Sequence, residues 1–219
     1  MKTKITTTII CILFLNQFLS AIEVQRIIPA IAASGGKCFD ENTKIINVGI
    51  GFGGVSYYKY NKGKGYDYGR TPTFSFTYEQ AFKQKLGIGY LGIGAYLGYQ
   101  NAHYRYDNWD YNGGKYYYKH NWNYFLVASR AAYHFDVLNS EKAEVYVGAI
   151  IGLRIQTYSY SSNHPDPYYY DFYRERGNTI NPAYSIFAGA RWYFSKNVGF
   201  FGELGYGISY TTVGMSFKF

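Results

Sequence analysis

The sequence predicts an all-β fold, an eight-stranded antiparallel transmembrane β-barrel with a polar, side-chain-filled interior. Apolar residues alternate with small or polar ones in segment after segment, so each predicted strand has one apolar and one polar face. The connections between these segments are mostly either short turns or long loops, as in membrane barrels. The polar, glycine-rich face also carries the charged residues, which are costly to bury in an apolar core.

The chain ahead of the barrel has the features of an export signal. Lys2 and Lys4 give a charged start, and an apolar stretch over residues 5–19 precedes a small-residue cleavage site at 20–21. A later site at 30–32 stays open, and an uncleaved anchor is the alternative. We predict a signal peptide over 1–21 (up to 32), a periplasmic linker over 22–43 and the barrel over 44–219. Cys38 is then the only cysteine of the exported chain, which excludes an intramolecular disulfide.

The first four predicted strands follow the linker. In the first, Ile46, Val48 and Ile50 alternate with Asn47, Gly49 and Gly51. The same alternation continues in the next three, and its phase slips near Tyr90 and Leu91, where we expect a bulge. The predicted ranges are 44–57, 71–80, 85–100 and 121–135.

The last four predicted strands complete the ring. The fifth has an apolar face from Val145 to Ile155, opposite a face that carries Glu144 and Arg154. The eighth ends the sequence on Phe219, so the last strand is expected to close on the first. The predicted ranges are 143–158, 182–194, 198–206 and 209–219.

The loop lengths orient the predicted barrel. Short turns are expected at 81–84, 136–142, 195–197 and near Gly207, and long loops at 59–70, 101–120 and 159–181. With both termini in the periplasm, every short turn except the one at Gly207 falls on that side and the long loops reach the cell surface. A soluble lipocalin-like or sandwich fold is the alternative and would turn the apolar face inward.

A set of ionisable side chains is predicted to lie in the lumen. Arg130 and Glu144 flank one short turn, and Arg191 and Glu203 flank another, so we expect hydrogen-bonded pairs or a shared network. The structural interpretation is that they fill and stabilise a narrow barrel. The functional one is a gate or selectivity filter formed by Arg130, Arg154, Arg191 and Glu203. The full predicted lumen set is Glu79, Arg130, His134, Glu144, Arg154, Arg191, Glu203 and Lys218.

The predicted loops are dense in tyrosine. Tyrosines near the strand ends fit an interfacial girdle. Others lie too far out for that role and indicate a recognition surface for a glycan or a protein. These binding candidates are Tyr66, Tyr68, Tyr111, Tyr168, Tyr169 and Tyr170.

The chain carries no pattern of a known catalytic or cofactor site. Nucleophile-elbow, phosphate-loop, zinc and dinucleotide motifs are missing, so neither an enzyme nor a cofactor is expected. A metal site from His103 and His120 is a weaker alternative to solvated histidines. The net charge of +8 gathers in loops, and for an exported chain it favours lipid phosphates, as in lipopolysaccharide, over nucleic acid.

The C-terminal segments resemble a known family. The runs GARWYF (189–194), NVGFFGELGYG (197–207) and VGMSFKF (213–219) are similar to the C-terminal half of OmpA/OmpX-like small outer-membrane barrels, in a tyrosine-rich form like that of Bacteroidetes. The resemblance implies an outer-membrane location and a terminal signal, Phe217 and Phe219, for the barrel-assembly machinery. It implies no single activity. The expected role is envelope-structural or surface-binding, with a narrow channel as the alternative and a lipid-modifying enzyme less favoured.

Overall fold

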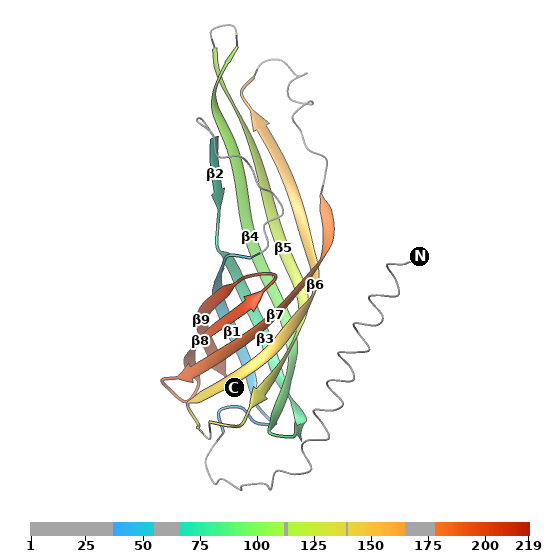
Figure 1. Cartoon of the computed structure of the whole chain (residues 1–219), viewed down its shortest axis with the longest axis vertical. Coiled ribbons are helices and arrows are strands. Elements are labelled where there is room, and N and C mark those ends of the chain that lie inside the picture. The colour runs from blue at the N-terminus through green and yellow to red at the C-terminus, as the bar shows by residue number, and fades with distance from the viewer. Residues whose placement is uncertain (1–36, 55–65, 112–113, 139, 165–177) are drawn as a thin grey trace, which may run out of the picture.

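The computed structural model describes residues 37–54, 66–111, 114–138, 140–164 and 178–219. Within them the chain forms one antiparallel sheet that closes on itself (Figure 1). No helix in these ranges is long and apolar enough to cross a membrane. The strands are β1 (Lys44–Phe52), β2 (Tyr66–Arg70), β3 (Thr73–Leu86), β4 (Gly89–Tyr111), β5 (Gly114–Phe135), β6 (Ala143–Ser162), β7 (Thr179–Tyr193), β8 (Val198–Tyr206) and β9 (Thr211–Lys218).

The ring confirms the predicted barrel and its eight positions. β2 and β3 both pair with β4 and are separated only by Thr71 and Pro72, so together they occupy one position. Proline lacks a backbone donor, which explains the break in the ladder at this point. The first strand pairs with the last from Ile45–Lys218 to Phe52–Thr211, as the alternation of the final segment predicted.

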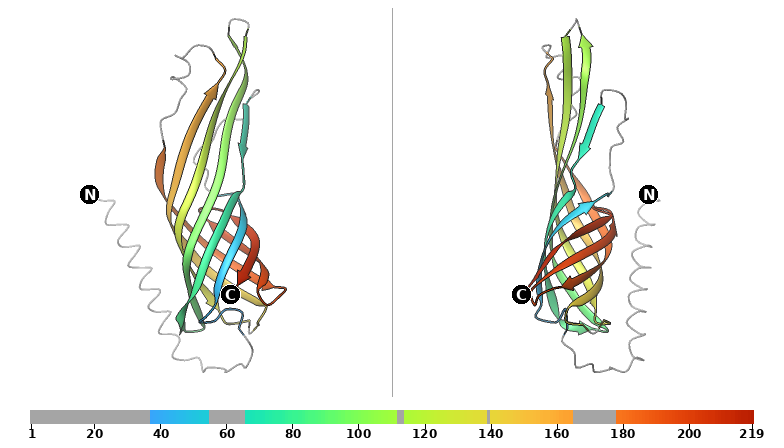
Figure 2. Two further views of the ribbon diagram at one scale, coloured as in Figure 1. Left: turned by 180° about the vertical axis from the view of Figure 1, so that it is seen from behind. Right: turned by 90° about the vertical axis from the view of Figure 1, so that its left-hand side faces the viewer.

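Several predicted strand limits were wrong. The segment 101–120, expected to be a long loop, is mostly a paired hairpin of β4 and β5, with register from Asn101–Asn123 to Tyr111–Gly114. β6 also extends to Ser162. Together with β2 these strands rise beyond the ring as an open sheet, which we call the extension (Figure 2). Period-two alternation continues through it, but its polar and aromatic composition resembles that of a loop.

The first predicted turn was also misplaced. β3 continues through residues 81–84 to Leu86, and the chain turns at Gly87, whose φ of +63° favours glycine. The predicted bulge lies opposite its expected position. Ala81 pairs with Gly92 and Lys85 with Tyr90, so residues 82–84 of β3 face the single residue Leu91. The extra residues therefore belong to β3.

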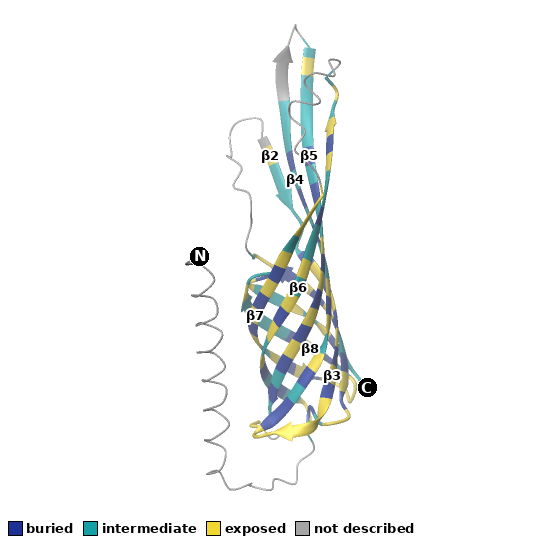
Figure 3. Ribbon diagram, turned by 90° about the vertical axis from the view of Figure 1, so that its right-hand side faces the viewer, coloured by how far each residue is buried: buried dark blue, intermediate teal, exposed yellow. Residues whose placement is uncertain are grey.

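The burial of polar and apolar side chains is inverted relative to that in a soluble sandwich. Along the strands exposed apolar residues alternate with buried polar ones (Figure 3). Ile151 is 72% exposed and Leu204 67%, while Glu79 and Ser216 are fully buried. The polar interior is packed, as in the buried ladder where Ser216 donates to Asn47 and Asn47 donates to Thr77. The apolar face therefore forms the outside of the ring.

Candidate functional site

Six ionisable side chains meet inside the ring in one network. They project inward from β3, β5, β6, β7 and β8, because strand positions two apart share a face. Five of them are nearly inaccessible to solvent, and the Glu203 side chain is 11% exposed. The members, which we call the lumen network, are Glu79, Arg130, His134, Glu144, Arg191 and Glu203.

Arg130 is the central cation of the lumen network. Its Nε donates to Glu79 Oε2 at 3.0 Å, and its Nη2 donates to Glu203 Oε1 at 2.6 Å. The guanidinium also lies 4.0 Å from the ring centroid of Phe187. Tyr146 donates its hydroxyl to the same Glu203 oxygen at 2.9 Å. One buried guanidinium therefore holds two carboxylates from different strands.

His134 connects Glu79 to the third carboxylate, Glu144. Its Nε2 lies 2.5 Å from Glu79 Oε1 and its Nδ1 lies 3.0 Å from Glu144 Oε2. Glu144 also pairs with Arg191. Since both ring nitrogens face carboxylate oxygens, only the doubly protonated imidazolium donates to both. With that charge the three carboxylates are balanced by two guanidinium groups and one imidazolium.

The partners within the network differ from those predicted. Arg130 pairs with Glu79 and Glu203 instead of Glu144, and Arg191 pairs with Glu144 instead of Glu203. In the β5–β6 register Arg130 lies opposite Ile150, well away from Glu144, whereas Arg191 lies directly opposite Glu144 in the β6–β7 register. The predicted pairs were therefore wrong, while the alternative of a shared network is what the structure contains.

Two members of the predicted lumen set lie elsewhere. Lys218 donates to the carbonyl of Cys38 at 3.3 Å and lies over the Tyr193 ring. Arg154 lies near the other end of the ring, over Tyr124, in a cavity described below. Between that cavity and the network the inward positions of β5 are Leu126 and Ala128, part of a buried apolar cluster.

The segment around Phe39 covers the lower end of the ring. Its packing was not predicted from the sequence. Phe39 is buried and its ring stacks on His134 at 3.6 Å between centroids. Asp40 forms a turn by accepting from Asn42 N and Thr43 Oγ1. That turn has a sequence signal, since an Asp followed closely by Asn and Thr often bonds its own backbone. Lys37 and Lys85 both pair with Asp136, at 3.1 and 2.9 Å, which fastens the segment to the ring.

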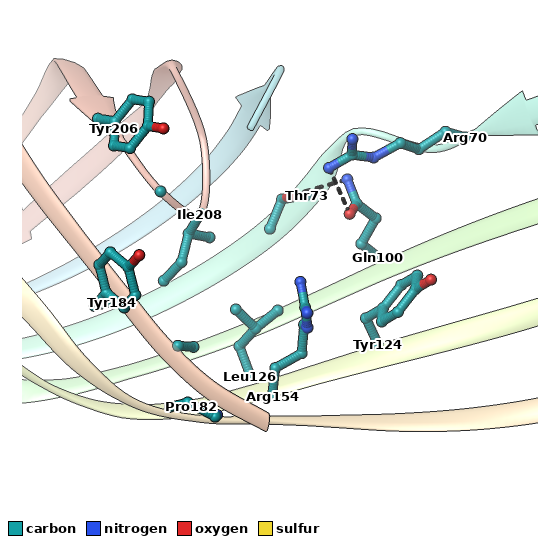
Figure 4. A pocket seen from close by; sticks show the side chains of 12 residues that line it. Arg70, Thr73, Gln100, Tyr124, Leu126, Arg154, Pro182, Tyr184, Tyr206 and Ile208 are labelled. Atoms are coloured by element: carbon teal, nitrogen blue, oxygen red, sulfur yellow. Dashed lines mark hydrogen bonds between the residues drawn. The ribbon is translucent and has the colours of Figure 1, made fainter. Parts of the chain in front are cut away.

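The cavity at the upper end lies where the extension meets the ring (Figure 4). Its volume is about 110 Å³, and Arg70, Gln100 and Arg154 are among its lining residues. Arg70 donates to Gln100 Oε1 at 2.8 Å and to the Gly53 carbonyl at 3.2 Å. Gln100 in turn donates to Thr73 at 3.1 Å. We call this cavity the outer cup.

The other predicted site residues are placed only in part. Tyr66 begins β2 and Tyr111 ends β4, Tyr68 packs against a buried aromatic cluster of the extension, and residues 168–170 lie outside the described part of the chain. Phe219 is 68% exposed and exchanges backbone hydrogen bonds with Lys44. Phe217 pairs with Ile46 and Val198.

The two histidines considered for a metal lie on opposite faces of the extension. His120 is opposite Tyr104 and His103 opposite Asn121 in the β4–β5 register, so their side chains alternate. His103 lies 3.7 Å from Asp67 and His120 bonds Tyr158 at 2.8 Å. The described residues contain no group of three or more histidine, cysteine or acidic side chains placed to hold a metal ion.

Comparisons with known proteins give structural similarity only. No protein-family model matches the chain, and neither does any curated protein. Among solved structures, the N-terminal β-barrel domain of Pseudomonas aeruginosa OprF is 16% identical with a TM-score of 0.44, over 83% of this chain and 100% of that one. The outer membrane protein OprG of the same organism is 10% identical with a TM-score of 0.47, over 82% and 97%. Ail, the attachment invasion locus protein of Yersinia pestis, is 12% identical with a TM-score of 0.41, over 83% and 100%.

Proposed function

We propose that this chain is an integral outer-membrane β-barrel, of the small OmpA/OmpX-like kind, that catalyses no reaction. It would be exported by its signal peptide, inserted by the barrel-assembly machinery through Phe217 and Phe219, and surrounded by outer-membrane lipid. Its role would be to stabilise the envelope and to bind a surface glycan or protein through the tyrosine-rich extension.

One observation carries the membrane assignment. Large apolar side chains cover the outside of a closed ring whose interior is polar and charged. Exposed apolar patches of this extent are rare on soluble monomers. Along β5 the outer face changes from Val127 and Phe125 to Asn123 and Asn121, and Asn101 donates to both asparagines. This change supports a boundary between lipid and water at the base of the extension.

A narrow channel is the second candidate, because charges line the lumen. Two features of the interior favour a closed barrel instead. The lumen network is neutralised and hydrogen-bonded within itself. One buried apolar cluster contains both Leu126, which lines the outer cup, and Phe187, which lies against Arg130 of the network. An eight-stranded barrel leaves room for little beyond its own side chains.

Two measurements test this proposal. The purified protein should run faster on a gel unboiled than boiled, since a folded barrel is compact; equal mobility would contradict the barrel. In a planar bilayer the folded protein should be silent. Steady conductance steps whose ion selectivity changes with Arg191→Glu would establish the channel instead.

The binding role has its own test. A variant that lacks residues 104–119, rejoined by a short turn, removes the upper β4–β5 hairpin and leaves the ring intact. Wild type should bind a surface glycan from an array, and this variant should not, while both keep the heat-dependent gel shift. Equal binding by both would exclude the hairpin as the binding surface.

A further inference from the structure

The outer cup gathers positive charge at one end of the ring. Arg70 comes from β2 and Arg154 from β6, strands that are far apart in sequence and not neighbours in the sheet. In Figure 4 the Arg70 guanidinium lies beside Gln100, and the Arg154 side chain points from another strand toward Thr73 and Gln100. Among the described residues that line the cup, none is acidic. The described lining therefore carries two guanidinium groups and no carboxylate, whereas the lumen network below it contains both kinds of group.

Arg70 is held in place by neutral groups. Arg70 donates to an amide oxygen and a backbone carbonyl, and to no carboxylate within the described ranges. Gln100 is fixed in turn, because its Nε2 donates to the Thr71 carbonyl and to Thr73 Oγ1, both at 3.1 Å. The Arg154 guanidinium lies 5.5 Å from the ring centroid of Tyr124, and Arg154 also interacts with another group. Such support keeps a guanidinium oriented before a ligand arrives.

The size and chemistry of the cup define its ligand. A water molecule needs on the order of 10 Å³ of such space, so a cavity of about 110 Å³ holds several waters or one small anion. Guanidinium groups bind phosphate and sulfate through paired N–H donors. Thr73 adds a neutral hydroxyl donor to the same lining.

We propose that the outer cup binds a compact oxyanion, a phosphate or sulfate group, between Arg70 and Arg154. The group is either a free ion or a substituent of a surface glycolipid such as the phosphates of lipopolysaccharide. This inference rests on the proposed function, because the orientation of the barrel places the cup at the cell surface. It names the chemistry that the upper end of the barrel recognises.

The experiment uses the full exported chain in neutral maltoside micelles. Inorganic phosphate is titrated and followed by ³¹P NMR, and lipopolysaccharide is titrated in phosphorylated and dephosphorylated forms. Arg70→Gln and Arg154→Gln are the test variants. Lys196→Gln is the control, since Lys196 is an exposed cation in the turn between β7 and β8 and does not line the cup. Arg154→Lys replaces Arg154→Gln if the latter loses the heat-dependent gel shift.

Saturable binding that weakens at least ten-fold in both cup variants, and remains within two-fold in Lys196→Gln, supports the site. Binding of inorganic phosphate identifies a free oxyanion, and binding of phosphorylated lipopolysaccharide alone identifies a lipid-linked one. No binding by wild type, equal weakening in all three variants, or weakening in fewer than both cup variants overturns the inference. A wild type that binds no anion but keeps its gel shift refutes this inference alone, whereas a missing gel shift refutes the proposed function.

Discussion

Replacing Arg130 with leucine removes the central cation of the lumen network. The guanidinium makes three hydrogen bonds to two carboxylates, at 3.0 Å to Glu79 and at 2.6 and 3.3 Å to Glu203. The Arg130 side chain is 1% exposed and that of Glu79 is fully buried, so water cannot replace the lost donors. Breaking a buried pair by removing one partner costs about 3–5 kcal/mol. We expect the free energy of unfolding to fall by that amount.

Equilibrium unfolding by urea in micelles, followed by tryptophan fluorescence and the gel shift, measures this change. Arg105→Leu is the control. Its pair with Asp107 is exposed, at 41% and 45%, and such pairs contribute about 0–1 kcal/mol. If Arg130→Leu lowers the free energy of unfolding no more than the control does, the view that the network stabilises the barrel is refuted.

A double-mutant cycle separates the pair from the rest of the network. Glu203→Gln should cost less in the Arg130→Leu background than in wild type, because the carboxylate has already lost its guanidinium. Residues that share hydrogen bonds typically couple by about 0.5–3 kcal/mol. Additive effects would contradict a direct interaction between these two residues.

Three further predictions follow from other contacts. Phe39→Ala removes the buried ring stacked on His134 and should lower the free energy of unfolding by about 3–5 kcal/mol; a urea midpoint equal to wild type would exclude a structural role for the segment at the lower end. Gly94→Ala places a methyl group against the Tyr78 carbonyl and should cost about 1–3 kcal/mol, whereas Gly202→Ala, with nothing within 4 Å, should leave the urea midpoint unchanged. Burial would raise the pKa of Asp136, but hydrogen bonds from Lys85 and Lys37 hold that pKa below its ordinary value. The ion pairs of Asp136 therefore stabilise the fold fully above the ordinary aspartate pKa, and this stabilisation is lost as pH falls through the lower pKa of the folded state. Asp136→Asn should be less stable than wild type at neutral pH and equally stable in acid. A difference in stability that stays constant across this pH range would contradict the ion pair.

The barrel could be predicted from the sequence because its physical cause is local. Alternation within each strand, as in Val145 to Arg154, fixes which side chains face out, and the parity of the strands fixes the side of each turn. The pairing of Glu79 with Arg130 could not be predicted, because it depends on how far each tilted strand is displaced along its neighbour. That displacement is a property of the closed ring.

The extension and the outer cup were missed for a different reason. The alternation continues past Asn101, but its outer positions become polar once they leave the apolar belt, so the pattern resembles a loop. Arg70 is the last residue of the predicted loop 59–70, where the sequence gives no reason to single it out. Only the pairing of β2 with β4 brings it beside Gln100 and across the barrel mouth from Arg154.

The central claim is that the apolar outer face of the ring lies in lipid. Spin labels at Ile151 and Leu204 on the exposed face, and at Ser161 on the extension, test it in bilayers with Cys38 replaced by serine. Labels at Ile151 and Leu204 should collide with oxygen and be shielded from a water-soluble nickel complex, while the label at Ser161 should show the reverse. Nickel access at Ile151 and Leu204 equal to that at Ser161 would place the apolar face in water and exclude a membrane barrel.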